Sequence, residues 1–75
     1  MNAMIFELWD TETNNIVGTY ESEDAALAAV QATLRAQGMR AVETLLLGRE
    51  DDAGESALIA QGHDLVKLAE RLSLR

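Results

Sequence analysis

The 75-residue chain contains no cysteine and only a few aromatic and basic residues. Without cysteine it forms no disulfide framework and no thiolate metal site. Its three aromatic residues, Phe6, Trp9 and Tyr20, all lie near the N-terminus, so alanine and leucine must fill most of the core. A chain of this length buries only roughly 60% of the surface that its unfolded state exposes. We therefore expect a single small domain over residues 1–75, with a thin core.

The sequence also lacks long apolar runs and clusters of basic residues. No run approaches the roughly 20 apolar residues of a membrane-spanning helix, and the segment MNAMIFELWD has neither the basic nor the apolar region of a secretory signal. A cytoplasmic protein is therefore expected. The 13 acidic and 6 basic residues give a formal net charge of -7. Phosphate backbones are bound by clustered lysine and arginine, so we expect no direct binding to nucleic acid, and none to membranes.

The first half of the chain predicts a hairpin followed by a helix. Residues 4–9 alternate with a period of two, which is typical of a strand. The polar residues 10–15 and the strand-forming residues 16–20 complete a hairpin. Ser22 is placed to cap a helix, because its hydroxyl can accept a hydrogen bond from a free amide of the first turn. Gly38 is suited to the left-handed conformation that closes such a helix.

The second half predicts the same order of elements. Residues 42–47, VETLLL, indicate a third strand, and residues 50–54, EDDAG, indicate a turn of short polar residues. Residues 56–60, SALIA, indicate a fourth strand. Asp64 is a suitable N-cap for a final short helix, in which leucines recur at helical spacing.

The predicted order is therefore ββαββα, with a ββα unit at 4–38 and another at 42–73. At an offset of 38 residues the two units echo each other in architecture, although few residues are identical. We predict the α+β class: a two-layer domain with one four-stranded antiparallel sheet and two helices on one face. The order of the strands rests on analogy alone.

This arrangement leaves one face of the sheet without helices. If the even-numbered residues of the first strand face the helices, the odd-numbered ones face away, and the offset of 38 adds two leucines to them. Contiguous apolar patches on small proteins are commonly interaction sites. The alternative is that the parity of a strand is misassigned, since the leucines at 45–47 fit either face. The candidate interface residues are Ile5, Trp9, Leu45 and Leu47.

Two acidic segments are candidate cation sites. The segment Asp10–Glu21, DTETNNIVGTYE, places oxygen-bearing side chains at positions 1, 3, 5 and 12 of an EF-hand calcium loop. Such a loop joins two helices, whereas here strands precede and enter the segment, so we favour the hairpin. The segment Glu50–Asp52 is a second cluster, but a turn does not preorganise its carboxylates. We predict no metal and no cofactor.

The sequence gives no support for catalysis. His63 is the only histidine, and without cysteine or a G-x-S-x-G motif no nucleophile is marked beside it. We interpret His63 as a loop residue. A thin core also leaves little room for a ligand pocket of ordinary size. We therefore expect a protein that is not an enzyme.

Four segments of the chain, FELWDTETNNIVGTY, EDAALAAV, LLLGREDD and IAQG, resemble a family of small bacterial proteins of unassigned function. Members of that family show an LWD…G…GTY hairpin, an acid- and alanine-rich helix, an LGxxD turn and an IAxG strand. The resemblance covers roughly residues 5–70 and implies the same fold, but it brings no activity and no catalytic residue. The family has glycine at the first turn where this chain has Asn15, and asparagine also tolerates a left-handed conformation.

Two functional hypotheses follow. The first is a non-catalytic protein-interaction module that forms a homodimer through the sheet face around Trp9. The alternative is an acidic regulator, of inhibitor or antitoxin type, that docks onto a basic surface of a partner protein. The simpler explanation of the acidity is solubility, and we favour it over a docking face. Salt distinguishes the two hypotheses, because it screens charge pairs but does not weaken apolar contacts.

Overall fold

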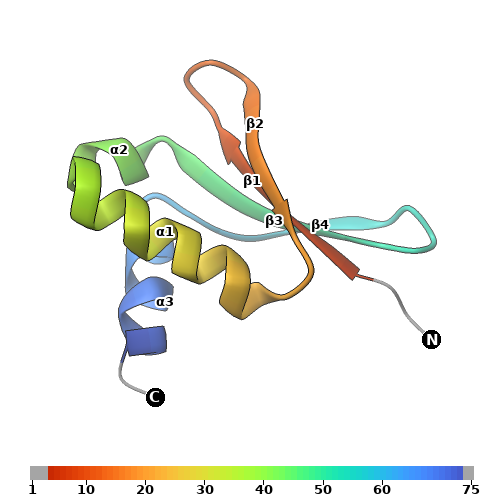
Figure 1. The fold of residues 1–75 in the computed structure, drawn as a ribbon. Coiled ribbons are helices and arrows are strands. Elements are labelled where there is room, and N and C mark those ends of the chain that lie inside the picture. The colour runs from red at the N-terminus through yellow and green to blue at the C-terminus, as the bar shows by residue number, and fades with distance from the viewer. Residues whose placement is uncertain (1–3, 74–75) are drawn as a thin grey trace.

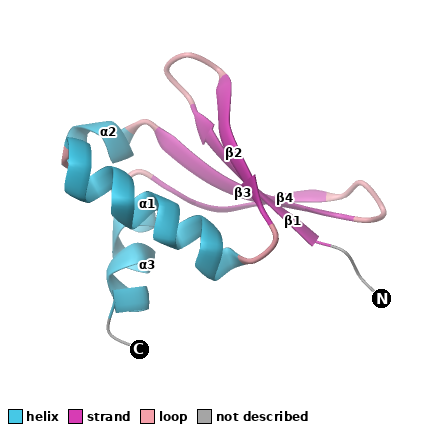
Figure 2. Cartoon of the chain, viewed as in Figure 1, coloured by secondary structure: helices cyan, strands magenta, loops and turns pink. Residues whose placement is uncertain are grey.

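Two β-hairpins, each followed by helix, make up the computed structural model, which describes residues 4–73. The four strands form one antiparallel sheet in the order β2-β1-β3-β4. Figure 1 and Figure 2 show the helices grouped on one side of this sheet. The predicted ββαββα fold is confirmed, with one added short helix. The elements are β1 (Met4–Asp10), β2 (Asn15–Tyr20), α1 (Glu23–Gln37), α2 (Met39–Glu43), β3 (Leu45–Asp51), β4 (Ser56–Gln61) and α3 (His63–Ser73).

The two hairpins meet at the central strands β1 and β3, where Leu8 lies opposite Leu47. Each hairpin contains one bulge. The β1–β2 register shifts between Leu8 and Trp9, and the β3–β4 register shifts between Leu47 and Gly48. Leu8 therefore corresponds to Leu47, and Trp9 to Gly48. The two hairpins are related by an approximate two-fold axis that passes through the Leu8–Leu47 pair.

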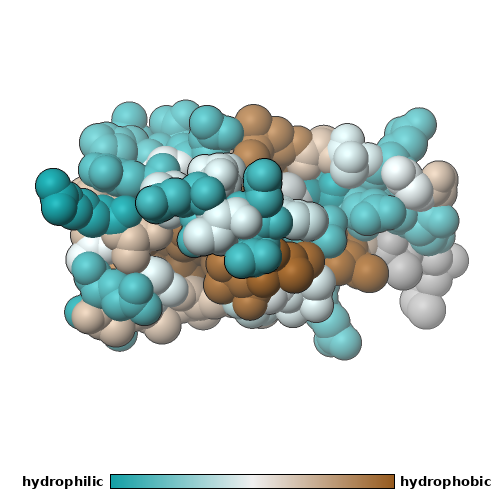
Figure 3. Space-filling view, turned by 90° about the horizontal axis from the view of Figure 1, so that it is seen from above, coloured by the Kyte–Doolittle hydropathy of each residue, from teal (hydrophilic) through white to brown (hydrophobic). Residues whose placement is uncertain are grey.

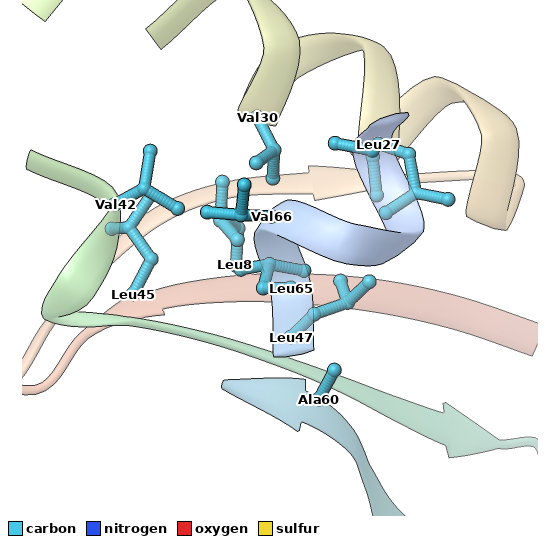
Figure 4. Close-up of a cluster of buried hydrophobic side chains, with 11 residues drawn as sticks. Leu8, Leu27, Val30, Val42, Leu45, Leu47, Ala60, Leu65 and Val66 are labelled. Carbon is cyan, nitrogen blue, oxygen red and sulfur yellow. The ribbon is translucent and has the colours of Figure 1, made fainter. Parts of the chain in front are cut away.

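The core lies between the helices and the face of the sheet that they cover, which we call the inner face. Leu8 and Leu47 are fully buried at the centre of this face. Figure 4 shows side chains from the three helices converging on the strands. Tyr20 and Phe6 pack against the margin of this cluster. The buried hydrophobic residues are Leu8, Ala26, Leu27, Val30, Val42, Leu45, Leu47, Ala60, Leu65, Val66 and Ala69.

Helix α1 begins and ends where the sequence predicts. Ser22 Oγ accepts a hydrogen bond of 3.1 Å from the Ala25 amide, so Ser22 is the N-cap. Gly38 follows the last turn with a φ of 85°, a conformation that glycine adopts without strain. The helix is held against α3 by a hydrogen bond of 2.7 Å that Gln31 Nε2 donates to the carbonyl of Ala69.

The segment between α1 and the third strand differs from the prediction. Residues 39–43 form the helix α2, so the third strand begins at Leu45 and not at Val42. The helical turn brings Val42 into the core, and Leu45, the first residue of β3, is buried there as well. Helix α3 also begins two residues early, at His63, which places Asp64 in its first turn and not at its N-cap.

The leucines of β3 also differ from the prediction, in the face of the sheet on which they lie. Leu45 and Leu47 are 5% and 0% exposed and lie on the inner face, so the prediction that placed them on the uncovered face is wrong. Leu46 occupies the uncovered face instead. A register shift of one residue exchanges the two faces of a strand. The predicted offset of 38 was one residue short of the observed correspondence of Leu8 with Leu47.

Replacing single leucines of β3 by alanine tests this register. Leu47→Ala removes a fully buried side chain, and we expect it to lower the free energy of unfolding by about 2–5 kcal/mol. Leu46→Ala trims a half-buried side chain, and we expect a loss of roughly 1 kcal/mol or less. Urea unfolding of both variants measures the difference. Equal losses would contradict the register.

Candidate interaction surface

The face of the sheet opposite the helices, which we call the outer face, carries a row of large apolar side chains. Trp9 lies opposite Ile16 on β2 and opposite Leu46 on β3, so these three side chains are neighbours. Trp9 is 37% and Ile16 is 44% exposed. Ile5 and Leu58 extend this surface and are more than half exposed. Figure 3 shows hydrophobic surface among hydrophilic side chains in the middle of the view.

The structure places the four candidate interface residues in two groups. Ile5 and Trp9 lie on the outer face, as the alternation of β1 predicts. Leu45 and Leu47 lie in the core. The prediction from the sequence did not include Ile16, Leu46 and Leu58 among the residues of the outer face. The position of Ile16 follows once the turn at 11–14 is known, because Asp10 then pairs with Asn15 and Trp9 with Ile16. The bulge in β4 hides the position of Leu58.

An open hollow of about 420 Å³ lies beside Trp9 on this face. Gly48 lies within it, opposite Glu7 on one side and Leu58 on the other. Because glycine has no side chain, the sheet surface is low at this point between its neighbours. The hollow has an apolar part, formed by Trp9, Leu46 and Leu58, and two carboxylates, those of Glu7 and Glu50.

The charged residues that the alternation of β1 and β3 places on the outer face, Glu7 and Glu50, are both acidic. Glu7 and Glu50 are diagonal neighbours on β1 and β3, a relation that separates such positions by roughly 7–8 Å. The strands contain one basic residue, Arg49. Arg49 lies opposite Phe6 and Ala57 and alternates with Glu50, so its side chain belongs to the inner side. Neither Glu7 nor Glu50 forms an ion pair with a residue in the range 4–73.

The Asp10–Glu21 segment is a hairpin. Asp10 Oδ1 accepts a hydrogen bond of 2.9 Å from the Glu12 amide, which fixes the turn. Thr11 Oγ1 donates to the carbonyl of Thr44 at 2.8 Å. Asn14 has a φ of 58°, so the left-handed position expected at Asn15 lies one residue earlier. Within residues 4–73, no three histidine, aspartate or glutamate side chains are grouped as metal ligands would be.

The Glu50–Asp52 segment is also part of a hairpin, and β3 extends through Asp51 before the turn begins. Asp51 Oδ1 accepts hydrogen bonds of 3.0 Å from the amides of Ala53 and Glu55. Glu50 lies on the outer face, and Asp52 is exposed in the turn. The three carboxylates therefore have separate surroundings, and the Asp51 carboxylate holds the turn.

His63 is the first residue of α3 and not a loop residue as predicted. Its Nε2 lies 3.6 Å from Glu43 Oε1 at the end of α2, and its side chain is largely exposed. An exposed pair of this kind contributes little to stability. The contact bridges the exposed ends of two helices and gives no indication of a catalytic site.

No family model matches the chain, and no curated protein or solved structure matches it. The resemblance to a family of small bacterial proteins therefore stays a prediction. Over residues 4–73, no helix is long and apolar enough to cross a membrane.

Calcium addition tests the hairpin interpretation of Asp10–Glu21. A ligand that binds the folded state raises the melting temperature, and the Asp10 carboxylate is already hydrogen-bonded within its turn. We therefore expect the melting temperature in millimolar calcium to equal the melting temperature in millimolar magnesium. A calcium-specific increase that Glu12→Gln abolishes would contradict the hairpin interpretation.

Proposed function

We propose that the protein is a small non-catalytic interaction module that self-associates through its outer sheet face. The observation that supports this proposal is the one-sided cover of the sheet. Helices α1 and α3 lie on the inner face, while the outer face exposes Ile5, Trp9, Ile16 and Leu58 to solvent. An exposed apolar surface of this extent is typical of an interaction site on a small protein.

The dimensions of the molecule are adequate for a stable dimer. It measures 36 × 32 × 17 Å, a slab with one short dimension, as expected for one layer of helices on one sheet. A standard interface takes about 800 Å² from each partner. One broad side of the slab is larger than this, so an interface of standard size fits on one side of the molecule.

The row formed by Ile16, Trp9 and Leu46 is the expected centre of the interface. Tryptophan is enriched among the residues that dominate binding energy. Burial of apolar surface contributes about 25 cal/mol per Å², and a chain with a thin core gains from each additional buried side chain. Glu7 and Glu50 lie beside the row, where the charged rim of an interface belongs.

The mass in solution tests self-association directly. We expect light scattering over a range of protein concentrations to give a dimer for the native chain and a folded monomer for Trp9→Lys. Met39→Lys is the matched control, because Met39 is 45% exposed on α2, away from the sheet. This control should remain a dimer. A native chain that is monomeric at every concentration would overturn self-association.

A second candidate function is an acidic module that docks onto a basic surface of a partner protein. The observation that favours it is the charge of the outer face, where neither Glu7 nor Glu50 forms an ion pair with another described residue. Two stacked copies of such a face bring like charges together. A partner with basic side chains would neutralise them instead.

The salt dependence of the dimer separates apolar association from charge pairing. Salt screens the repulsion between the acidic faces and strengthens apolar burial, so we expect the dissociation constant of the dimer to fall as sodium chloride is added. The double variant Glu7→Gln, Glu50→Gln should dimerise more tightly at low salt and depend less on salt. A native dimer that dissociates as salt rises would indicate charge pairing instead.

A further inference from the structure

We infer that the hollow beside Trp9 is a binding subsite for an arginine side chain of a partner protein. This inference rests on the second candidate function, the acidic module that docks onto a basic partner, because it assigns the chemistry of that partner to the same outer face. The hollow combines an apolar part with two carboxylates. An arginine side chain combines an apolar stem with a planar cation in the same way.

The apolar part of the hollow matches the stem and the plane of the guanidinium group. Gly48 leaves the sheet surface low, and the side chains of Trp9 and Leu58 stand on either side of this region in the lining. A stem of methylene groups buries apolar surface against such walls while its charged end stays near water. The indole of Trp9 offers a face on which a guanidinium group stacks.

The charged part of the hollow matches the cation. Glu7 and Glu50 both line it and are diagonal neighbours in the sheet. Their carboxylates accept charge-assisted hydrogen bonds, and a guanidinium group presents five donors in a planar fork. Within residues 4–73 no ion pair engages either carboxylate. A cation supplied by a partner would therefore not have to displace an existing ion-pair partner of Glu7 or Glu50.

Arg49 also lines the hollow, but its side chain does not supply this cation. It alternates with Glu50 along β3 and lies opposite Ala57, on the inner side of the sheet. A second, smaller hollow on that side is lined by Arg49 together with Asp51 and Glu55. The acidic groups of the outer face are thus left for a partner.

The surroundings of the hollow define the rest of the partner segment. The row Ile16–Trp9–Leu46 continues directly from the hollow across β3, β1 and β2. An arginine in the hollow therefore brings its neighbours in the partner over an apolar surface. The partner that fits is a polypeptide in which arginine is flanked by apolar residues, and not a purely basic one.

Tryptophan fluorescence tests the inference, because Trp9 is the only tryptophan and lines the hollow. The probes are the peptide acetyl-Leu-Arg-Leu-Arg-Leu-amide and its citrulline analogue, in which a neutral urea group replaces each guanidinium group. We expect the arginine peptide to change the Trp9 emission and to bind about tenfold more tightly than the citrulline peptide. That ratio corresponds to one charge-assisted hydrogen bond.

Three single variants test which carboxylates bind the arginine peptide. Glu7→Gln and Glu50→Gln should each weaken binding of the arginine peptide by about tenfold. Glu55→Gln makes the same change of charge outside this hollow and should leave the affinity within about twofold. Circular dichroism checks that each variant is folded. Equal binding of the two peptides, equal effects of the three variants, or no binding to a monomeric form of the chain would overturn the inference.

The arginine subsite and self-association can be overturned separately. Peptide binding is measured on the native chain and on Ile16→Thr, since Ile16 lies in the apolar row but does not line the hollow. Light scattering on the same samples reports the oligomeric state. A monomeric native chain that binds the arginine peptide selectively would overturn self-association and support the subsite. A dimer whose Ile16→Thr variant is monomeric and still shows no selectivity would overturn the subsite alone.

Discussion

The antiparallel pairing of β1 with β3 at Leu8 and Leu47 is the constraint on which the rest of the structure depends. It joins the two hairpins, and it places both leucines at the centre of the inner face, where the helices bury them completely. Because side chains alternate along a strand, fixing these two residues also fixes which residues face the other way. Because Leu8 and Leu47 lie on the inner face, their chain neighbours Trp9 and Leu46 lie on the outer face.

The helices cover only the inner face. Helix α1 spans Glu23–Gln37 and α3 spans His63–Ser73, and the two pack against each other with a hydrogen bond from Gln31 to the carbonyl of Ala69. The short helix α2 fills the end of the same layer with Val42. The described part of the chain thus has no helix for the second face. A sheet with one covered and one open face normally alternates apolar and polar residues, and the apolar row around Trp9 departs from that pattern.

The parts of the fold that could be predicted from the sequence are those with local signals. The alternation of β1 gave the correct orientation of Ile5 and Trp9, and the hydroxyl of Ser22 correctly marked the start of α1. The orientation of the β3 leucines could not be predicted, because three adjacent leucines do not alternate and their register is set by β1, far away in the sequence. The hollow at Gly48 depends on three strands at once, so no local pattern reveals it.

The same register limits how the protein associates with copies of itself. The edge strands β2 and β4 contain no charged residue that would discourage pairing with another sheet, but each pairs with its neighbour through a bulge. Bulges twist an edge away from further strands. On the outer face the carboxylates of Glu7 and Glu50 oppose face-to-face pairing, since a second copy brings like charges closer. The apolar row favours contact with another apolar surface, while the carboxylates disfavour an acidic surface. A partner that supplies an arginine flanked by apolar residues matches both the apolar row and the carboxylates.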